Sequence, residues 1–132
     1  MSSRSLKRAP TVQKAARGMT SNLAGAAAEE IVAGHYRRLG CRVLAQRWRG
    51  EAGEIDLIFQ QAGTTVFVEV KRSRTQARAA ESLRPKQIAR LMAAAGEYMA
   101  GLPDGANSDV RFDVALVSGA GLIEVLEGAL GA

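Results

Sequence analysis

The sequence contains few of the residues that build several common kinds of site. Cys41 is the only cysteine and His35 the only histidine among its 132 residues. A single cysteine excludes an intramolecular disulfide and a zinc site made of cysteines, and a single histidine argues against a histidine-ligated metal. A metal bound by this chain must therefore have oxygen ligands, which favours magnesium, manganese or calcium.

Long apolar runs and a secretory signal are also missing. No stretch approaches the roughly 20 apolar residues that a membrane-spanning helix needs, and the N-terminal segment lacks the apolar centre of a signal peptide. We therefore expect a cytoplasmic protein with no membrane partner. Its 47% hydrophobic and 23% charged residues are ordinary for a globular protein, and its length favours one domain.

Positive charge is concentrated at the N-terminus. The chain has 18 basic and 13 acidic side chains, and residues 1–20 contain five of the basic ones and no acid. From residue 21 onward, basic and acidic side chains are equal in number. We predict that residues 1–20 form a disordered basic tail, which either is only solvated or adds attraction to phosphates. Residues 21–132 are predicted to form the single domain.

Hydrophobic periodicity and turn residues predict a helix, three strands, a second helix and one or two final strands. The helices are expected at residues 23–39 and 84–100. The strands are expected at residues 41–49, 54–60, 65–72, 110–117 and 122–126. In the first helix, the predicted buried stripe is Ala24, Ala28, Ile31, Val32, His35 and Leu39. This order fits an α/β fold in which a mixed sheet has a helix on each side.

Residues 53–72, GEIDLIFQQAGTTVFVEVKR, are the most informative stretch of the chain. They read as two strands joined by a turn at Gln61–Thr64, with a register that runs from Gln60 opposite Thr65 to Glu54 opposite Lys71. Successive strand residues point to opposite faces. One face is therefore predicted to be wholly apolar, with Ile55, Leu57, Phe59, Val66, Val68 and Val70.

Acidic residues at the open end of this hairpin suggest a metal site. The predicted register places Asp56 opposite Glu69. Two facing carboxylates repel each other, and a divalent cation between them is the most direct reason for such a pair. The Val70 carbonyl lies in the same span, and Glu29 would add a third carboxylate if the first helix packs over this face.

Lys71 lies two residues after Glu69 and therefore on the same strand face. Its ammonium group could orient an attacking water or stabilise charge on a phosphoryl oxygen, which together with a metal suits phosphodiester hydrolysis. A simpler role is a salt bridge to Glu69 or to Glu54, its predicted cross-strand partner. For the acids, the simpler explanations are a register shifted by one residue or neutralisation by arginines.

Three other basic residues are candidates for contact with nucleic acid. Arg49 follows Trp48, and these two could stack on a base or simply pack a strand against a helix. Lys86 is unfavourable for the dipole at the start of its predicted helix, which favours a phosphate contact. Arg111 shares a strand face with Asp113, so these two could instead pair with each other.

An acid followed on the next strand by Glu-x-Lys resembles the motif of the PD-(D/E)xK nuclease superfamily. Here the acid is Asp56, and Glu69-Val70-Lys71 follows. The chain resembles still more closely the UPF0102, or YraN-type, proteins, a bacterial family of uncharacterised function. This resemblance covers about residues 23–118 and rests on GEIDLI at 53–58 followed by FVEVKR at 67–72. Further matching residues are Gly25, Glu29, Gly40, Arg49, Lys86 and Arg111-Phe112-Asp113-Val114.

The resemblance implies a restriction-endonuclease-like core of helix, three strands, helix and strand. It also implies a magnesium- or manganese-dependent endonuclease that acts on DNA rather than RNA. A further similarity to archaeal Holliday-junction resolvases points to branched or damaged DNA as the substrate. Carried over to this chain, the similarity implies that Glu29, Asp56 and Glu69 bind the metal and that Lys71 is catalytic.

The resemblance extends to the substrate contacts. The nucleic-acid-binding candidates are Arg49, Arg72, Lys86, Gln87 and Arg111, and Gln87 falls where resolvase-like nucleases often have a glutamine. The chain departs from the family at Arg47, where Asn is usual. A homodimer is expected by analogy with nucleases that cut both strands. The alternative from a different class is a nucleic-acid-binding module with the nuclease fold and little or no catalysis, in which the basic tail, Arg74, Arg78, Arg84 and Lys86 matter more than the acids.

Overall fold

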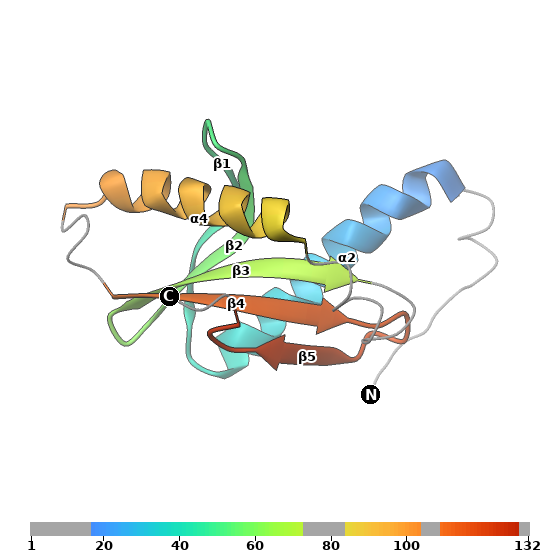
Figure 1. Ribbon diagram of the computed structural model, residues 1–132. Helices are drawn as coiled ribbons and strands as arrows, with labels where there is room; N and C mark the ends of the chain where they lie inside the picture. The colour runs from blue at the N-terminus through green and yellow to red at the C-terminus, as the bar shows by residue number, and fades with distance from the viewer. Residues whose placement is uncertain (1–16, 73–83, 104–108, 130–132) are drawn as a thin grey trace.

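The computed structural model describes residues 17–72, 84–103 and 109–129, with side chains from residue 25 onward. Its elements are α2 (Arg17–Arg38), β1 (Arg42–Arg49), β2 (Glu54–Gln61), β3 (Thr64–Arg72), α4 (Pro85–Ala100), β4 (Asp109–Val117) and β5 (Ile123–Leu126). The strands form one five-stranded sheet in the order β1-β2-β3-β4-β5 (Figure 1). β3 and β4 are parallel, with α4 as the intervening crossover, and the other neighbours are antiparallel. This mixed α/β fold is consistent with a restriction-endonuclease-like core.

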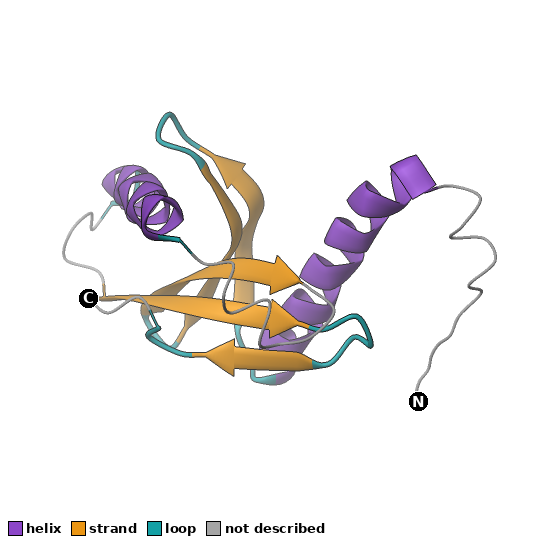
Figure 2. Cartoon of the chain, turned by 45° about the vertical axis from the view of Figure 1, so that its right-hand side comes forward, coloured by secondary structure: helices purple, strands orange, loops and turns teal. Residues whose placement is uncertain are grey.

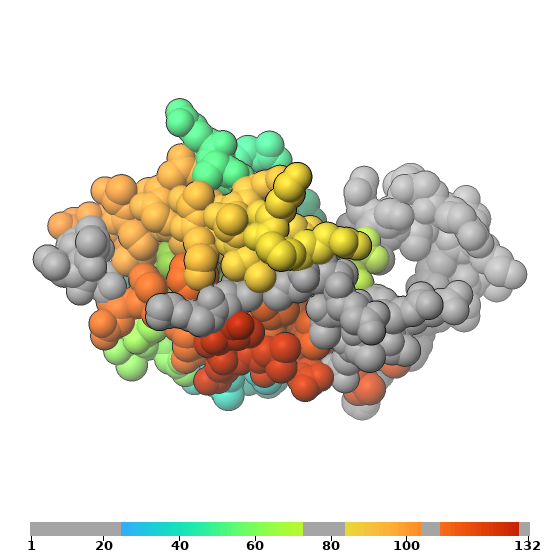
Figure 3. Space-filling model, viewed as in Figure 1, coloured from blue at the N-terminus to red at the C-terminus, as the bar shows by residue number. Residues whose placement is uncertain are grey.

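α2 and α4 lie on opposite faces of the sheet (Figure 2). The α2 side buries Leu57, Phe59, Val66 and Val68 with Ala28, Val32, Ala33 and Tyr36. The α4 side buries Ile55, Ile58, Phe67 and Phe112 with Leu91, Ala94, Ala95 and Met99. In Figure 3, α4 covers the middle of the near face and the loop between β1 and β2 rises above it. The predicted mixed sheet with a helix on each side is therefore confirmed.

The predicted element boundaries agree with the structure to within one residue, except at the start of α2. This helix begins at Arg17, whereas the prediction began it at residue 23. Residues 17–20 of the predicted tail therefore belong to the helix, and residues 1–16 lie outside the described residues. No helix in the described ranges is long and apolar enough to cross a membrane.

The hairpin of β2 and β3 closes with the predicted turn. Ala62 and Gly63 have φ values of 48° and 91°, the left-handed conformations that a two-residue type I′ turn requires. Gly63 adopts its value without the steric cost that a Cβ would bring. From this turn the ladder follows the predicted register, through Gln60 with Thr65 and on to Leu57 with Val68.

The predicted register is wrong at the open end of the hairpin. Within the described sheet, the β2–β3 ladder ends at Leu57 and Val68, so three predicted pairs are missing: Asp56–Glu69, Ile55–Val70 and Glu54–Lys71. β2 instead continues its pairing with β1, as far as Arg49 with Glu54. β2 and β3 separate here because β2 stays paired with β1 beyond its last pair with β3.

Ile55 lies on the face opposite to the predicted one. It is fully buried on the α4 side together with Ile58, so strict alternation along β2 is broken between these two residues. β1 is irregular at the same level. Arg47 lies between Gln46, which pairs with Leu57, and Trp48, which pairs with Ile55, and it has a left-handed φ of 51°. The irregularity reverses the face that simple alternation predicts for Ile55.

Tyr36, which the predicted stripe omitted, is the largest buried side chain of α2. Its ring stacks on Phe59 with centroids 4.3 Å apart. The predicted stripe member Leu39 is 53% exposed, and His35 is only partly buried. The helix is rich in alanine and has apolar residues on several sides, so periodicity alone did not separate its buried face from its neighbours.

Asp113 is a fully buried carboxylate that joins four parts of the fold. It accepts hydrogen bonds from the Tyr36 hydroxyl at 2.6 Å, from two Arg111 nitrogens at 2.9 Å each and from the Gly128 amide at 3.0 Å. Arg111 also donates to Gln61 at 3.2 Å. Burial, and then the hydrogen bond to Asp113, raise the pKa of Tyr36 well above its ordinary value. The hydroxyl therefore stays protonated and keeps donating.

Replacing Asp113 should destabilise the fold severely. Asp113→Ala leaves the Arg111 guanidinium and the Tyr36 hydroxyl without their acceptor, so we expect the free energy of unfolding to fall by about 3 kcal/mol. Urea unfolding followed by circular dichroism measures this. Asp109→Ala, at the exposed start of the same strand, is the matched control and should stay within about 0.5 kcal/mol of the unsubstituted protein. A loss below about 1 kcal/mol for Asp113→Ala would contradict the assignment.

Candidate active site

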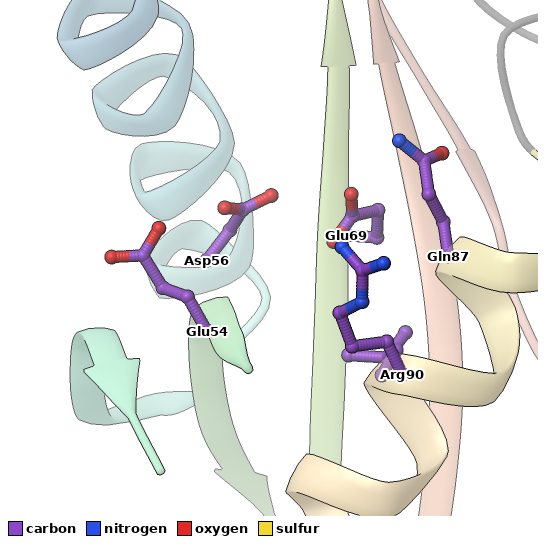
Figure 4. A pocket seen from close by; sticks show the side chains of 6 residues that line it. Glu54, Asp56, Glu69, Gln87 and Arg90 are labelled. Atoms are coloured by element: carbon purple, nitrogen blue, oxygen red, sulfur yellow. The ribbon is translucent and has the colours of Figure 1, made fainter. Parts of the chain in front are cut away.

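A cavity of about 200 Å³ lies where β2 and β3 separate. Its lining residues are Glu54, Asp56, Glu69, Gln87, Arg90 and Leu91. Figure 4 shows Glu54 and Asp56 on β2 at one side, Glu69 on β3 in the middle, and Gln87 and Arg90 reaching in from α4. The two carboxylates predicted to form a cross-strand pair thus line one cavity together, although their backbones are not paired.

Asp56 is held by the backbone of the neighbouring strand. The Val70 amide donates a hydrogen bond to Oδ2 of Asp56 at 2.8 Å. Burial, and then the negative charge of Glu69, raise the pKa of Asp56 to about 7, while the hydrogen bond from Val70 works in the opposite direction. Negative charge is therefore costly at this position, and a cation would relieve that cost.

Lys71 connects Glu69 to α4. Its Nζ lies 3.3 Å from Oε2 of Glu69 and donates a hydrogen bond to Oε1 of Gln87 at 2.8 Å. The Lys71 side chain is only 13% exposed, so this geometry is well shielded from solvent. The sequence offered a salt bridge to Glu69 or to Glu54 as the simpler role of Lys71, and the salt bridge to Glu69 is present. Gln87, singled out by resemblance alone, lies against the lysine.

The predicted pairing of Lys71 with Glu54 is wrong. Glu54 lies 3.7 Å from Arg49, its cross-strand neighbour on β1. Their side chains are 41% and 79% exposed, so this pair contributes little to stability. The prediction was wrong because the β2–β3 ladder ends at Leu57, so Glu54 pairs with Arg49 on β1 and not with Lys71 on β3.

Glu29 is not among the residues that line the cavity. Its Oε1 accepts a hydrogen bond from Nε of Arg47 at 2.9 Å, although its charge still acts on Asp56. Within the described residues, no three His, Cys, Asp or Glu side chains come close enough to surround a metal ion. Arg47 has a left-handed φ of 51°, a conformation that the Asn usual in the resembled family adopts more easily.

The structure brings only some of the nucleic-acid-binding candidates to this cavity. Gln87 lines it, Arg49 pairs with the lining residue Glu54, and Lys86 is exposed next to Gln87. Arg72 lies at the end of β3, near Gly25 of α2. Arg111 is bound to Asp113, which also accepts a hydrogen bond from Tyr36 on the α2 side, and Arg111 is not among the residues that line the cavity.

Arg90 is a cavity residue that the sequence analysis missed. It lies on α4, one turn after Gln87 and just before Leu91, so all three share a helix face. A Cβ placed on Gly53 would come within 2.9 Å of Cγ of Arg90, which shows that the arginine stem rests on the backbone of Gly53. The spacing of Gln87, Arg90 and Leu91 was the signal available in the sequence.

The described site lies within a segment shared with known proteins. A family model described as "Uncharacterised protein family UPF0102" matches residues 28–117. A UPF0102 protein of Ruegeria pomeroyi is 53% identical over 117 residues, covering 89% of this chain and 95% of the relative. One from Cereibacter sphaeroides is 49% identical over 115 residues, covering 87% and 98%. A third, from Dinoroseobacter shibae, is 49% identical over 111 residues, covering 84% and 83%.

The raised pKa of Asp56 predicts a pH-dependent effect of neutralising it. The folded-state value of about 7 exceeds the ordinary value, so the metal-free fold loses stability as pH rises from about 4 to about 7. Asp56→Asn removes this loss and should raise the free energy of unfolding by about 1 kcal/mol or more at pH 8, with little change at pH 4.5.

Urea unfolding in the presence of a chelator tests this. Glu54→Gln is the matched control because Glu54 lines the same cavity but is 41% exposed, and it should show almost no pH-dependent difference. An Asp56→Asn variant that is equally stable relative to the unsubstituted protein at both pH values would contradict the electrostatic interpretation.

Proposed function

The chain belongs to the uncharacterised protein family UPF0102, and we propose that it is a metal-dependent endonuclease that hydrolyses phosphodiester bonds in DNA. One observation carries the proposal. Asp56 and Glu69, from two strands that separate, share a cavity beside a lysine that a glutamine holds in place. Two acids and a shielded lysine are the groups that such a hydrolysis requires.

The acids suit a hard divalent cation. Burial and the negative charge of Glu69 raise the pKa of Asp56, so negative charge on this carboxylate is costly and a cation bound to it would lower that cost. Magnesium commonly uses one or two protein carboxylates and keeps several waters, so it does not need a third acid. Asp56 and Glu69 would hold Mg²⁺ or Mn²⁺, with the Val70 carbonyl as a further candidate ligand. Glu29 would contribute only after separating from Arg47.

A bound cation would polarise the phosphate and make a bound water more acidic. The chain's own contribution comes from Lys71, whose ammonium group has three N–H donors. Gln87 accepts a hydrogen bond from one of them, and Glu69 lies 3.3 Å away as an ion-pair partner, so donor capacity remains for a phosphoryl oxygen or the attacking water. Because Gln87 fixes the lysine before substrate arrives, its charge is already in position to stabilise the transition state.

The substrate part of the proposal is DNA, with branched or damaged structures as the class that the resemblance implies. Basic side chains on three elements lie next to residues of the cavity: Arg49 on β1 pairs with Glu54, Lys71 on β3 pairs with Glu69, and the exposed Lys86 precedes Gln87 on α4. Fixed positive charge around a cavity attracts the phosphate backbone in a salt-dependent manner. This arrangement supports binding of a polyanion, and a homodimer would present two such cavities to the two strands.

A second candidate function is a nucleic-acid-binding module with little or no catalysis. Its supporting observation is the engagement of Glu29 by Arg47 at 2.9 Å, which leaves two acids without the third one implied by the resolvases. In this case the basic residues of the N-terminal tail, together with Lys86, would carry the function, and Asp56 and Glu69 would be dispensable for binding.

Cleavage assays separate the two candidates. Linear, nicked and four-way-junction DNA are incubated with the full chain and Mg²⁺ or Mn²⁺ under single-turnover conditions. The nuclease proposal expects cleavage that Lys71→Met lowers by at least about 100-fold and that Asp56→Asn abolishes. Arg42→Met is the matched control, since Arg42 contacts Gln60 rather than the acids, and it should cut at the unsubstituted rate.

The outcomes are distinct. Cleavage that survives Asp56→Asn would sink the proposed mechanism. DNA binding without cleavage of any of the three substrates would favour the binding module. Isothermal titration with Mn²⁺ provides a readout independent of activity, because heat of binding that disappears in Asp56→Asn supports the metal site even if the natural substrate is not in the panel.

A further inference from the structure

Arg90 is the cationic side chain that lines the acidic cavity, and its charge is not used within the described structure. The lining includes three carboxylates, Glu54, Asp56 and Glu69. Each already has a partner, since Glu54 pairs with Arg49, Asp56 accepts from the Val70 amide, and Glu69 pairs with Lys71. Among the contacts of the described residues, the Arg90 guanidinium makes no hydrogen bond and no ion pair.

The stem of Arg90 nevertheless packs on the start of β2, although the residue as a whole is exposed. A Cβ on Gly53 would lie 2.9 Å from its Cγ and 3.1 Å from its Cδ, so the methylene groups pack directly on the glycine backbone. Gly53 immediately precedes Glu54 at the start of β2. The absence of a side chain at Gly53 therefore lets α4 bring Arg90 close to the strand that carries Asp56.

Further contacts hold α4 in this position. Glu97, two turns after Arg90, accepts hydrogen bonds from the Glu51 amide at 3.0 Å and the Ala52 amide at 2.8 Å. Tyr98 meets Trp48 edge to face, with centroids 5.5 Å apart. These contacts tie the loop before β2 to α4, and they place the backbone of Arg90 next to the strand that carries Asp56.

We propose that Arg90 binds a backbone phosphate of the DNA substrate and positions it beside Asp56 and Glu69. A guanidinium group offers five N–H donors in a planar fork that matches two phosphate oxygens. A stem that packs on Gly53 and a charged end without a partner among the described residues suit a contact that forms only with a ligand. This inference rests on the proposed DNA substrate, and it assigns Arg90 a positioning role that does not require Arg90 to touch the metal.

The test compares DNA binding by Arg90→Met and Arg37→Met, both in the Asp56→Asn background so that no DNA is cut. Methionine keeps an unbranched stem on Gly53 and removes the charge. Arg37 is the matched control because it lies on α2, on the opposite face, and pairs with Glu30. Binding of a linear duplex and a four-way junction is measured by fluorescence anisotropy at several salt concentrations.

For Arg90→Met, we expect DNA binding to weaken about tenfold. The slope of log Kd against log salt should fall by about 0.9, the value for one lost phosphate contact. Arg90→Lys should restore the slope but not the full affinity, because it returns the charge without the fork. Arg37→Met should change neither quantity, and all variants should keep the same urea unfolding midpoint.

An unchanged Kd and slope in Arg90→Met would overturn the inference, as would a lowered unfolding midpoint that accounts for the weaker binding. These failures differ from failure of the nuclease proposal. If the unsubstituted chain binds DNA but cuts none, the slope still decides the role of Arg90. If the unsubstituted chain cuts DNA and Arg90→Met binds normally, the nuclease proposal stands and the Arg90 contact does not.

Discussion

The site depends on one hydrogen bond, from the Val70 amide to Oδ2 of Asp56. It forms where β2 continues with β1 and its ladder with β3 ends. A separated strand leaves amides without partners, and a buried amide without an acceptor is costly. The Asp56 carboxylate supplies that acceptor, so the strands can part without an unpaired Val70 amide. The cavity lies where the strands part, and burial there, together with the charge of Glu69, raises the pKa of Asp56 against the opposing effect of the Val70 hydrogen bond.

Two groups of charged side chains in the described structure, around Asp113 and around Asp56, differ in how completely their charges are satisfied. Around Asp113, an arginine, a tyrosine and a backbone amide provide four hydrogen bonds to one buried carboxylate. This cluster is complete and joins helix, sheet and C-terminal turn. Around Asp56, burial and neighbouring acids outweigh the single bond from Val70. The arrangement around Asp113 is typical of a structural ion pair, and the one around Asp56 is typical of a ligand-binding site.

Local patterns predicted the parts of the fold that depend on neighbours in sequence. Alternation and turn residues placed β2, β3 and their turn, because Ala62 and Gly63 close a hairpin whose register the turn itself sets. The same local rule failed from Asp56 onward, where β2 stays paired with β1 and β1 contains the irregularity at Arg47. It also failed to find Tyr36, since an alanine-rich helix has no single apolar face in its sequence.

By itself, the sequence determined the order of the elements, the absence of cysteine and histidine ligand sets, and the two-residue spacing that places Glu69 and Lys71 on one strand face. These are properties of composition and of short-range geometry. Only the tertiary structure decided that Glu54 turns to Arg49, that Glu29 is held by Arg47, and that Arg90 rests on Gly53 inside the cavity. Each of these contacts joins separate elements, and its partner is chosen by how β1, β2 and the helices pack, which no local periodicity encodes.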